Sequence, residues 1–178
     1  SPDPRMVAFV DEFAPSRSLR RTLRRVARTG EWSFTFDAAF VAVMQACAEP
    51  RNGQAGTWIT PDIVAAYHGL HRRGHAHSVE VWADGELVGG LYGVSIGRMF
   101  FGESMFTRVT DASKAAYATL IATLRRLEFT MVDCQQSTGH LASLGAREIS
   151  RNEFLARIGE FCELPGPDWS KVRIEWPE

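Results

Sequence analysis

The hydrophobic residues of this chain follow two spacings, and each spacing predicts a different kind of element. A period of three to four residues, typical of helices with one buried face, predicts helices over residues 16–29, 37–48, 61–73, 112–128 and 141–144. Alternation, or a short apolar run, predicts strands over residues 6–10, 32–36, 78–82, 86–94, 99–103 and 130–134. This order of elements predicts an α/β (α+β) fold, with helices packed on the faces of a mixed sheet.

Turn-forming residues mark the ends of several elements. Ser16 is a favourable N-cap for the first helix, and Gly30 is a favourable stop. Asp84-Gly85 separates two alternating runs and predicts a β-hairpin. Residues 50–56 read as a loop, and Gly89-Gly90, inside a predicted strand, indicates a close backbone approach or a bulge.

Length and composition describe an ordinary globular domain. The 178 residues suffice for one domain over 1–178, and the 45% apolar and 23% charged fractions exclude a disordered or collagen-like chain. No apolar run approaches the roughly 20 residues that span a bilayer. The three cysteines are odd in number, and no two form a Cys-x-x-Cys pair, so we expect reduced thiols in a cytoplasmic protein.

The net charge of −1 hides a strongly basic segment. The helix predicted over 16–29 carries six arginines and no acid, so the rest of the chain sums to −7. At 100° per residue these arginines share one face, opposite Leu19, Leu23 and Val26. Like charges at this spacing repel, and a polyanion such as a phosphate backbone would relieve the repulsion. A solvated charged surface is the alternative. The arginines are Arg17, Arg20, Arg21, Arg24, Arg25 and Arg28.

Two acids end apolar strands. Glu103 is the last residue of the strand predicted over 99–103. Asp133 lies near the end of the strand predicted over 130–134, with Gln135 beyond it. Strand ends are common ligand sites in sheets flanked by helices. The alternatives are a paired structural carboxylate for Glu103 and a turn cap for Asp133.

Four histidines gather near the middle of the chain and suggest a metal site. They lack the His-Glu-x-x-His arrangement, so positions on a helix surface and in a turn are the favoured interpretation, with no metal expected. The four are His68, His71, His75 and His77.

Several blocks of sequence, in a fixed order, then identify a family resemblance. They are SPDPR (1–5), GTWIT (56–60), GHAHSVEVW (74–82), LVGGLYG (87–93), FGESMF (101–106), ASK (112–114), VDCQ (132–135) and HLASLGA (140–146). Together they resemble the bacterial leucyl/phenylalanyl-tRNA–protein transferase family, from residue 1 to about residue 165.

The resemblance implies both an activity and a fold. Such enzymes move Leu, Phe or Met from aminoacyl-tRNA to a protein whose N-terminus is Arg or Lys, which marks that protein for degradation by the N-degron pathway. Their catalytic domain has an acetyltransferase-like (GNAT) fold with a largely antiparallel sheet, and it binds a tRNA 3′ end where relatives bind acyl-CoA. The ester donor is already activated, so no cofactor is expected. We further expect a monomer with no membrane partner.

The chemistry of such a transfer suggests roles for individual residues. Our hypothesis is that Asp133 and Gln135 position the acceptor N-terminus and that Glu103 positions the aminoacyl-adenosine or its amino group. Because an amide is too weak a base, Asp133 or the 2′-hydroxyl of the tRNA would take the proton. The basic face formed by the six arginines would bind tRNA. The pocket for the aminoacyl-adenosine would be lined by Trp58, Leu91, Met105, Leu120, Leu124 and Val132, with Leu120 and Leu124 where the family often has Phe.

Family members usually carry a smaller N-terminal domain before the SPDPR block, and here it is absent. We therefore expect a fragment or a naturally short homologue. Two alternatives to the transferase follow: an inactive or truncated tRNA-binding module, and a GNAT-type acyl-CoA N-acyltransferase. The lack of a Gly-rich pyrophosphate loop argues against the second alternative.

Overall fold

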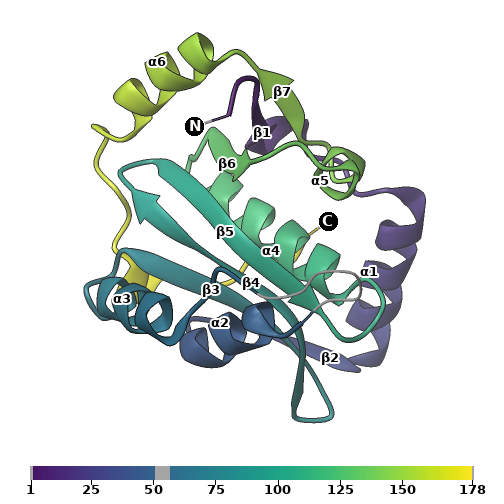
Figure 1. Ribbon diagram of the computed structural model, residues 1–178. Coiled ribbons are helices and arrows are strands. Elements are labelled where there is room, and N and C mark those ends of the chain that lie inside the picture. Colours follow the sequence, from purple (N-terminus) through teal and green to yellow (C-terminus); the bar gives the residue numbers. More distant parts are fainter. Residues whose placement is uncertain (1, 51–56, 178) are drawn as a thin grey trace.

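The computed structural model describes residues 2–50 and 57–177, and within them the strands form one seven-stranded sheet (Figure 1). The strand order is β2-β3-β4-β5-β6-β1-β7. Neighbouring strands are antiparallel except for β5 and β6, which are parallel. The strands are β1 (Arg5–Phe9), β2 (Trp32–Phe36), β3 (Ala76–Ala83), β4 (Glu86–Ile96), β5 (Met99–Thr107), β6 (Met131–Gln135) and β7 (Arg147–Ile149). The predicted mixed, largely antiparallel sheet is therefore confirmed.

Six α-helices and two short 3-10 helices accompany the sheet in the described residues. The α-helices are α1 (Arg17–Thr29), α2 (Phe40–Ala48), α3 (Pro61–Arg72), α4 (Ala112–Arg126), α5 (Gly139–Ser143) and α6 (Arg151–Phe161). The 3-10 helices are η1 (Val10–Glu12) and η2 (Trp169–Lys171). The predicted cap and stop of the first helix are confirmed, because the Ser16 side chain accepts the Leu19 N–H and Gly30 has a φ of 66°.

Two sequence-based boundaries are corrected, and a third prediction is not tested. The helix predicted from residue 37 begins only at Phe40, because Asp37 has a left-handed φ of 57° and its carboxylate accepts the Ser78 N–H at 2.8 Å. The strand predicted to end at residue 103 continues to Thr107, where it still pairs with Gly89. The predicted loop over 50–56 lies, apart from Pro50, outside the described residues.

Helices cover both faces of the sheet (Figure 1). Helices α1 and α4 bury their apolar residues in one core cluster, which also includes Met6 and Ala8 of β1. The alternate residues Val7 and Phe9 point to the other face and pack with α6. Helix α2, with part of α3, forms a third cluster against β4. The alternation along β1 therefore connects the sequence pattern with a three-layer arrangement.

Two glycines allow α4 and β3 to approach β4 closely. A Cβ atom on Gly89 would lie 2.6 Å from the Ala112 Cβ at the start of α4. On Gly90 it would lie 2.8 Å from the Val79 carbonyl oxygen. The close-approach interpretation of Gly89-Gly90 is therefore confirmed, and it fixes how near α4 lies to the sheet.

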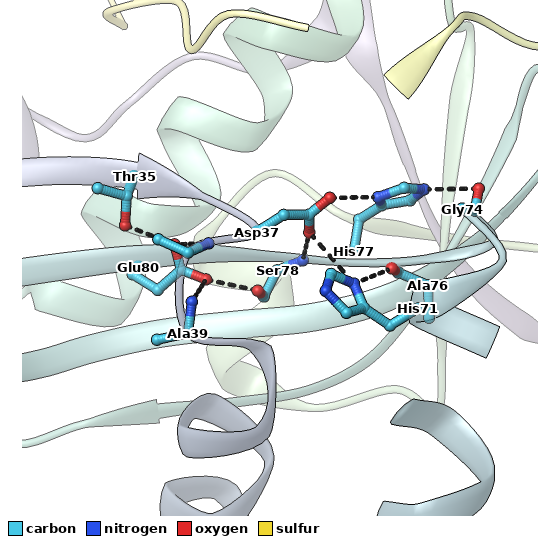
Figure 2. Close-up of polar contacts among 10 residues, drawn as sticks. Thr35, Asp37, Ala39, His71, Gly74, Ala76, His77, Ser78 and Glu80 are labelled. Atoms are coloured by element: carbon cyan, nitrogen blue, oxygen red, sulfur yellow. Dashed lines mark hydrogen bonds and ion pairs between the residues drawn. The ribbon is translucent and has the colours of Figure 1, made fainter. Parts of the chain in front are cut away.

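A buried acid supplies the cap that α2 lacks. The carboxylate of Glu80, on β3, is fully buried and accepts the Ala38 and Ala39 N–H groups at the start of α2. The hydroxyls of Thr35 and Ser78 also donate to it (Figure 2). Burial nevertheless raises the pKa of Glu80, since it disfavours the charged form.

The raised pKa of Glu80 predicts a pH-dependent stability. The folded state binds this proton more tightly than the unfolded chain, so stability present below the ordinary pKa is lost as pH rises through the folded pKa. The Glu80→Gln variant cannot titrate there. We expect its free energy of unfolding, relative to that of the unaltered chain, to improve steadily as pH rises from about 4 to 7. Urea unfolding at several pH values measures this difference.

The exposed Glu86→Gln variant, on the adjoining strand β4, is the matched control and should give a flat difference. A flat difference for Glu80→Gln as well would contradict the assignment.

Candidate functional site

A cavity of about 400 Å³ opens where β5 and β6 separate. The two strands pair in parallel only from Met99 opposite Met131 to Phe101 opposite Asp133. Beyond this point residues 102–105 of β5 and Cys134 of β6 line the cavity. The lining residues are Leu91, Tyr92, Phe100, Gly102, Glu103, Ser104, Met105, Tyr117, Leu120, Val132, Asp133, Cys134, Thr138, His140 and Leu141.

A β-bulge presents Glu103 to this cavity. Along β4 and β5, Tyr92 pairs with Ser104 but the next residue, Gly93, pairs with Gly102. Glu103 is therefore the extra residue of β5, with no partner across the ladder. Bulges of this kind redirect a side chain without ending the strand.

A second irregularity shapes the end of β6. Met6 of β1 pairs with Gln135, while Val7 pairs with Asp133, so Cys134 has no partner in the register. Gln135 has a left-handed φ of 64°. The two bulges flank the opening between the strands. The first is formed by Glu103 itself, and the second directly follows Asp133.

Asp133 is almost fully buried and fully engaged. The Arg5 guanidinium donates to both of its carboxylate oxygens, from Nε at 2.8 Å and from Nη2 at 2.6 Å. The Gln135 N–H donates to the same carboxylate at 2.9 Å. This bidentate pair opposes the hypothesis that Asp133 takes a proton, because its acceptor positions already hold a cation. Asp133 instead acts as a fixed acceptor.

Gln135 bridges the opening between β5 and β6. Its Nε2 atom donates to the Gly102 carbonyl oxygen at 3.0 Å and to Glu103 Oε2 at 3.1 Å. Both N–H donors of the amide are thus used, which leaves the Oε1 atom as its available acceptor. The structure brings Asp133, Gln135 and Glu103 together, as the sequence analysis expected.

Tyr67 is a site residue that the sequence analysis missed. It lies on α3, and its hydroxyl lies near enough to the Glu103 carboxylate to be affected by that charge. Burial and the Glu103 charge raise the pKa of Tyr67 to about 12, so the hydroxyl keeps its proton. The helical period of residues 61–73 predicted a helix but did not distinguish Tyr67 from the other apolar residues on it. Arg5 was missed as well, although it belongs to the SPDPR block.

Four of the predicted pocket residues line the cavity: Leu91, Met105, Leu120 and Val132. Leu124 does not, since it is fully buried in the cluster that α4 shares with the sheet, one helical turn beyond Leu120. Trp58 is absent from the lining too, and about half of its side chain is exposed. These two residues therefore lie outside this cavity, and their place in an aminoacyl-adenosine pocket stays a prediction.

The thiol at the cavity is unreactive. Burial, helped by the neighbouring Asp133 carboxylate, raises the pKa of Cys134 to about 12. At neutral pH this thiol stays protonated, and a protonated thiol is a poor nucleophile. The cavity therefore combines an apolar lining with a polar edge made by Glu103 and Gln135, and it offers no thiolate.

The basic face lies on the exposed side of α1. All six arginines are exposed, whereas Leu19, Leu23 and Val26 are buried, so the predicted two-sided helix is confirmed. The face has one neighbouring acid that the pattern did not reveal, because Glu31 forms an ion pair with Arg25. For the other five arginines no ion pair is recorded within residues 2–50 and 57–177.

Two of the four histidines belong to a buried polar network (Figure 2). His77 Nδ1 lies 2.7 Å from the Asp37 carboxylate, and His71 Nδ1 lies 2.8 Å from the Ala76 carbonyl oxygen. His68 and His75 are exposed. Among the described residues no group of three or more His, Cys, Asp or Glu side chains is arranged to hold a metal ion.

Comparison with known proteins gives a consistent match. The sequence model of the leucyl/phenylalanyl-tRNA protein transferase family matches residues 7–159. A protein of that name from Paraburkholderia xenovorans is 59% identical over 170 residues, which cover 95% of this chain and 69% of the relative. Its counterpart from Burkholderia cenocepacia (strain HI2424) is 58% identical, with coverages of 95% and 67%.

The fold also resembles a solved structure of distant sequence. A conserved protein of unknown function from Bacteroides thetaiotaomicron superposes with a TM-score of 0.54 at 15% identity, over 80% of this chain and 54% of that one. Within the described part of this chain, every helix is too short or too polar to cross a membrane.

Burial predicts an unusual titration of the tyrosines, and the Glu103 charge adds to the effect at Tyr67. All three tyrosines have raised pKa values, chiefly because they are buried: Tyr67 to about 12, and Tyr92 and Tyr117 also upward. Ultraviolet absorbance should detect little ionisation of the folded chain at pH about 10, where the unfolded chain is half ionised. Because the folded pKa values are raised, stability should be lost as pH rises from about 10 to about 12.

The Glu103→Gln variant should lower the Tyr67 pKa, since it removes a negative charge. The exposed Glu128→Gln variant is the control. An unchanged Tyr67 titration in Glu103→Gln would argue against the contact.

Proposed function

This chain belongs to the leucyl/phenylalanyl-tRNA protein transferase family, and we infer that it is an aminoacyltransferase. It takes leucine or phenylalanine from aminoacyl-tRNA and joins it to the N-terminal Arg or Lys of a protein. Methionine is a third donor that we propose. The observation that carries this conclusion is 59% identity over 95% of the chain, which includes the cavity residues from Leu91 to Leu141.

The cavity suits the side chain of the donor. A volume of about 400 Å³ is within the range of small-molecule pockets, and Leu91, Leu120 and Val132 offer an apolar lining. Such a lining accepts Leu, Phe and Met but discriminates weakly among them, because a methylene more or less changes binding by only about 1–3 kcal/mol. Charged donors would lose their hydration without a partner there.

The polar edge of the cavity suits the reaction. In the proposed step the neutral α-amine of the acceptor attacks the ester carbonyl, a C–N bond forms, and the bond to the ribose 3′-oxygen breaks. One proton moves from the amine to that oxygen. The ester is already activated, so the step needs no cofactor. Holding the reactants together accounts for much of such a rate enhancement.

The contacts at the site support distinct roles for three residues. Gln135 donates a hydrogen bond to Glu103, Tyr67 lies near it, and no cation pairs with it in the described residues, so its charge is available to the amino group of the aminoacyl-adenosine. The Gln135 Oε1 atom would accept from the attacking amine. Asp133 would hold Gln135, and the 2′-hydroxyl of the donor would carry the proton to the 3′-oxygen.

The charges of the chain suit two different partners. The basic face of α1 would bind the tRNA phosphates, while the remaining charge of −7 favours a cationic acceptor. We propose the cytoplasm, where charged tRNA is available, as the location, and a monomer as the working form. A tRNA-binding module without catalytic activity would bind tRNA but would transfer no amino acid. An acyl-CoA transferase would transfer an acyl group without tRNA.

The direct test is transfer of labelled leucine from leucyl-tRNA to a peptide that begins with Arg. We expect transfer by the unaltered chain, and a kcat lower by about a hundredfold in Glu103→Gln, because a misplaced donor loses the benefit of positioning. The exposed Glu128→Gln variant should match the unaltered chain. Near-normal kcat in Glu103→Gln at saturating substrates would refute its role, and no transfer by the unaltered chain would refute the proposed function.

Charge reversal on α1 tests the tRNA surface. The double variant Arg21→Glu/Arg24→Glu should raise the KM for leucyl-tRNA and should leave kcat nearly unchanged. The dependence of log affinity on log salt should fall by about 2, because each lost phosphate contact reduces it by about 1. The double variant Arg72→Glu/Arg73→Glu, at the exposed end of α3, makes the same change in net charge. Equal KM values for the two double variants would contradict the assignment.

A further inference from the structure

We propose that Arg5 is a positioning residue for aminoacyl transfer, acting on the reacting groups through Asp133 and Gln135. This inference rests on the proposed function. Arg5 begins β1 and stands 128 residues away from Asp133 in sequence. Its side chain is 14% exposed, and the Asp133 side chain it contacts is 1% exposed.

The first link is the bidentate pair between Arg5 and Asp133. Two parallel hydrogen bonds, at 2.8 and 2.6 Å, fix both the position and the plane of the carboxylate. A buried carboxylate without this cation would carry an uncompensated charge or take up a proton. The guanidinium therefore occupies both oxygens of the Asp133 carboxylate and holds it in place as a hydrogen-bond acceptor.

The second link runs from Asp133 to Gln135. The Asp133 carboxylate accepts the Gln135 N–H at 2.9 Å, at a residue whose φ of 64° is unfavourable for a side chain with a Cβ atom. Such a conformation persists only where the surroundings hold it. The Gln135 side chain then donates to Glu103, so the orientation of both polar groups at the cavity depends on this anchored turn.

The surroundings of Arg5 explain why its position is fixed. The guanidinium lies over the ring of Phe154 on α6, 5.1 Å from its centroid, and Phe154 is itself buried. Asp3, two residues earlier, accepts the Arg151 N–H at the start of α6. The segment before β1 is thus attached to α6, and Arg5, at the start of β1, lies beside the end of β6.

The chain contains a matched control. Arg147 on β7 also makes two hydrogen bonds to one carboxylate, that of Glu12, and also lies over a ring, that of Phe9 at 4.2 Å. Its side chain is about half exposed, and both of its side-chain hydrogen bonds go to Glu12. Arg147→Ala therefore removes the same kind of pair from the neighbouring strand without touching the proposed chain of contacts.

The experiment measures leucine transfer from leucyl-tRNA to an Arg-initiated peptide by Arg5→Ala, Arg5→Lys and Arg147→Ala, with circular dichroism to check folding. Arg5→Ala should lower kcat by roughly 10–100-fold, with the KM for leucyl-tRNA unchanged. Added guanidinium chloride, at concentrations that do not unfold the chain, should restore part of that loss. Arg5→Lys keeps the charge but not the fork, so its kcat should lie between the two values. Arg147→Ala should match the unaltered chain.

The remaining outcomes decide against the proposal. A normal kcat in Arg5→Lys and in folded Arg5→Ala would overturn it. A folded Arg5→Ala whose lost activity does not respond to guanidinium would also overturn it, since only a structural role would remain. If Arg5→Ala fails to fold, the kcat of Arg5→Lys decides alone. Transfer absent from the unaltered chain would overturn the proposed function and the role of Arg5 with it.

Discussion

The short parallel pairing between β5 and β6 is the constraint on which this site depends. The strands share a ladder only as far as Phe101 and Asp133 and then separate. A separation inside a sheet exposes unpaired backbone groups, which must find other partners. Here the Gln135 side chain satisfies the Gly102 carbonyl oxygen across the opening, and the remaining space forms the cavity. The same break that creates the cavity thus brings polar groups to its edge.

The electrostatic arrangement at this edge is uneven. Asp133 and Glu103 both face the cavity, but Arg5 compensates the charge of Asp133, while the uncharged amide of Gln135 donates to Glu103. Two acids that look alike in the sequence therefore have different chemistry. One is a fixed part of the framework, and the other keeps a charge that a cationic substrate group can meet. Because the ion pair of Asp133 with Arg5 is buried, removing either member would leave an uncompensated charge inside the protein.

The rest of the fold supports the site from both faces of the sheet. Helix α4 lines the cavity with Tyr117 and Leu120, and Gly89 allows it to lie directly on β4. Helix α3 contributes Tyr67 from the other face. Helix α6 lies behind Arg5 through Phe154. The basic face of α1 lies apart from these contacts, on the exposed side of its helix.

The sequence by itself determined the elements and much of the candidate site. Its periods predicted the amphipathic α1, the β3–β4 hairpin and the close approach at Gly89-Gly90, because these depend on local spacing and turn geometry. The blocks around Glu103 and Asp133 indicated the polar residues.

The sequence did not determine register. The bulge at Cys134, the pairing of Arg5 with Asp133, and the proximity of Tyr67 to Glu103 join segments that lie far apart in the chain. The bulge at Glu103 lies within the β4–β5 hairpin, but no turn residue marks it. Only tertiary packing decides such contacts, because strand register and burial follow from how distant surfaces fit together. For the same reason Leu124, which shares a helical face with Leu120, lies in the core, while Leu120 lines the cavity.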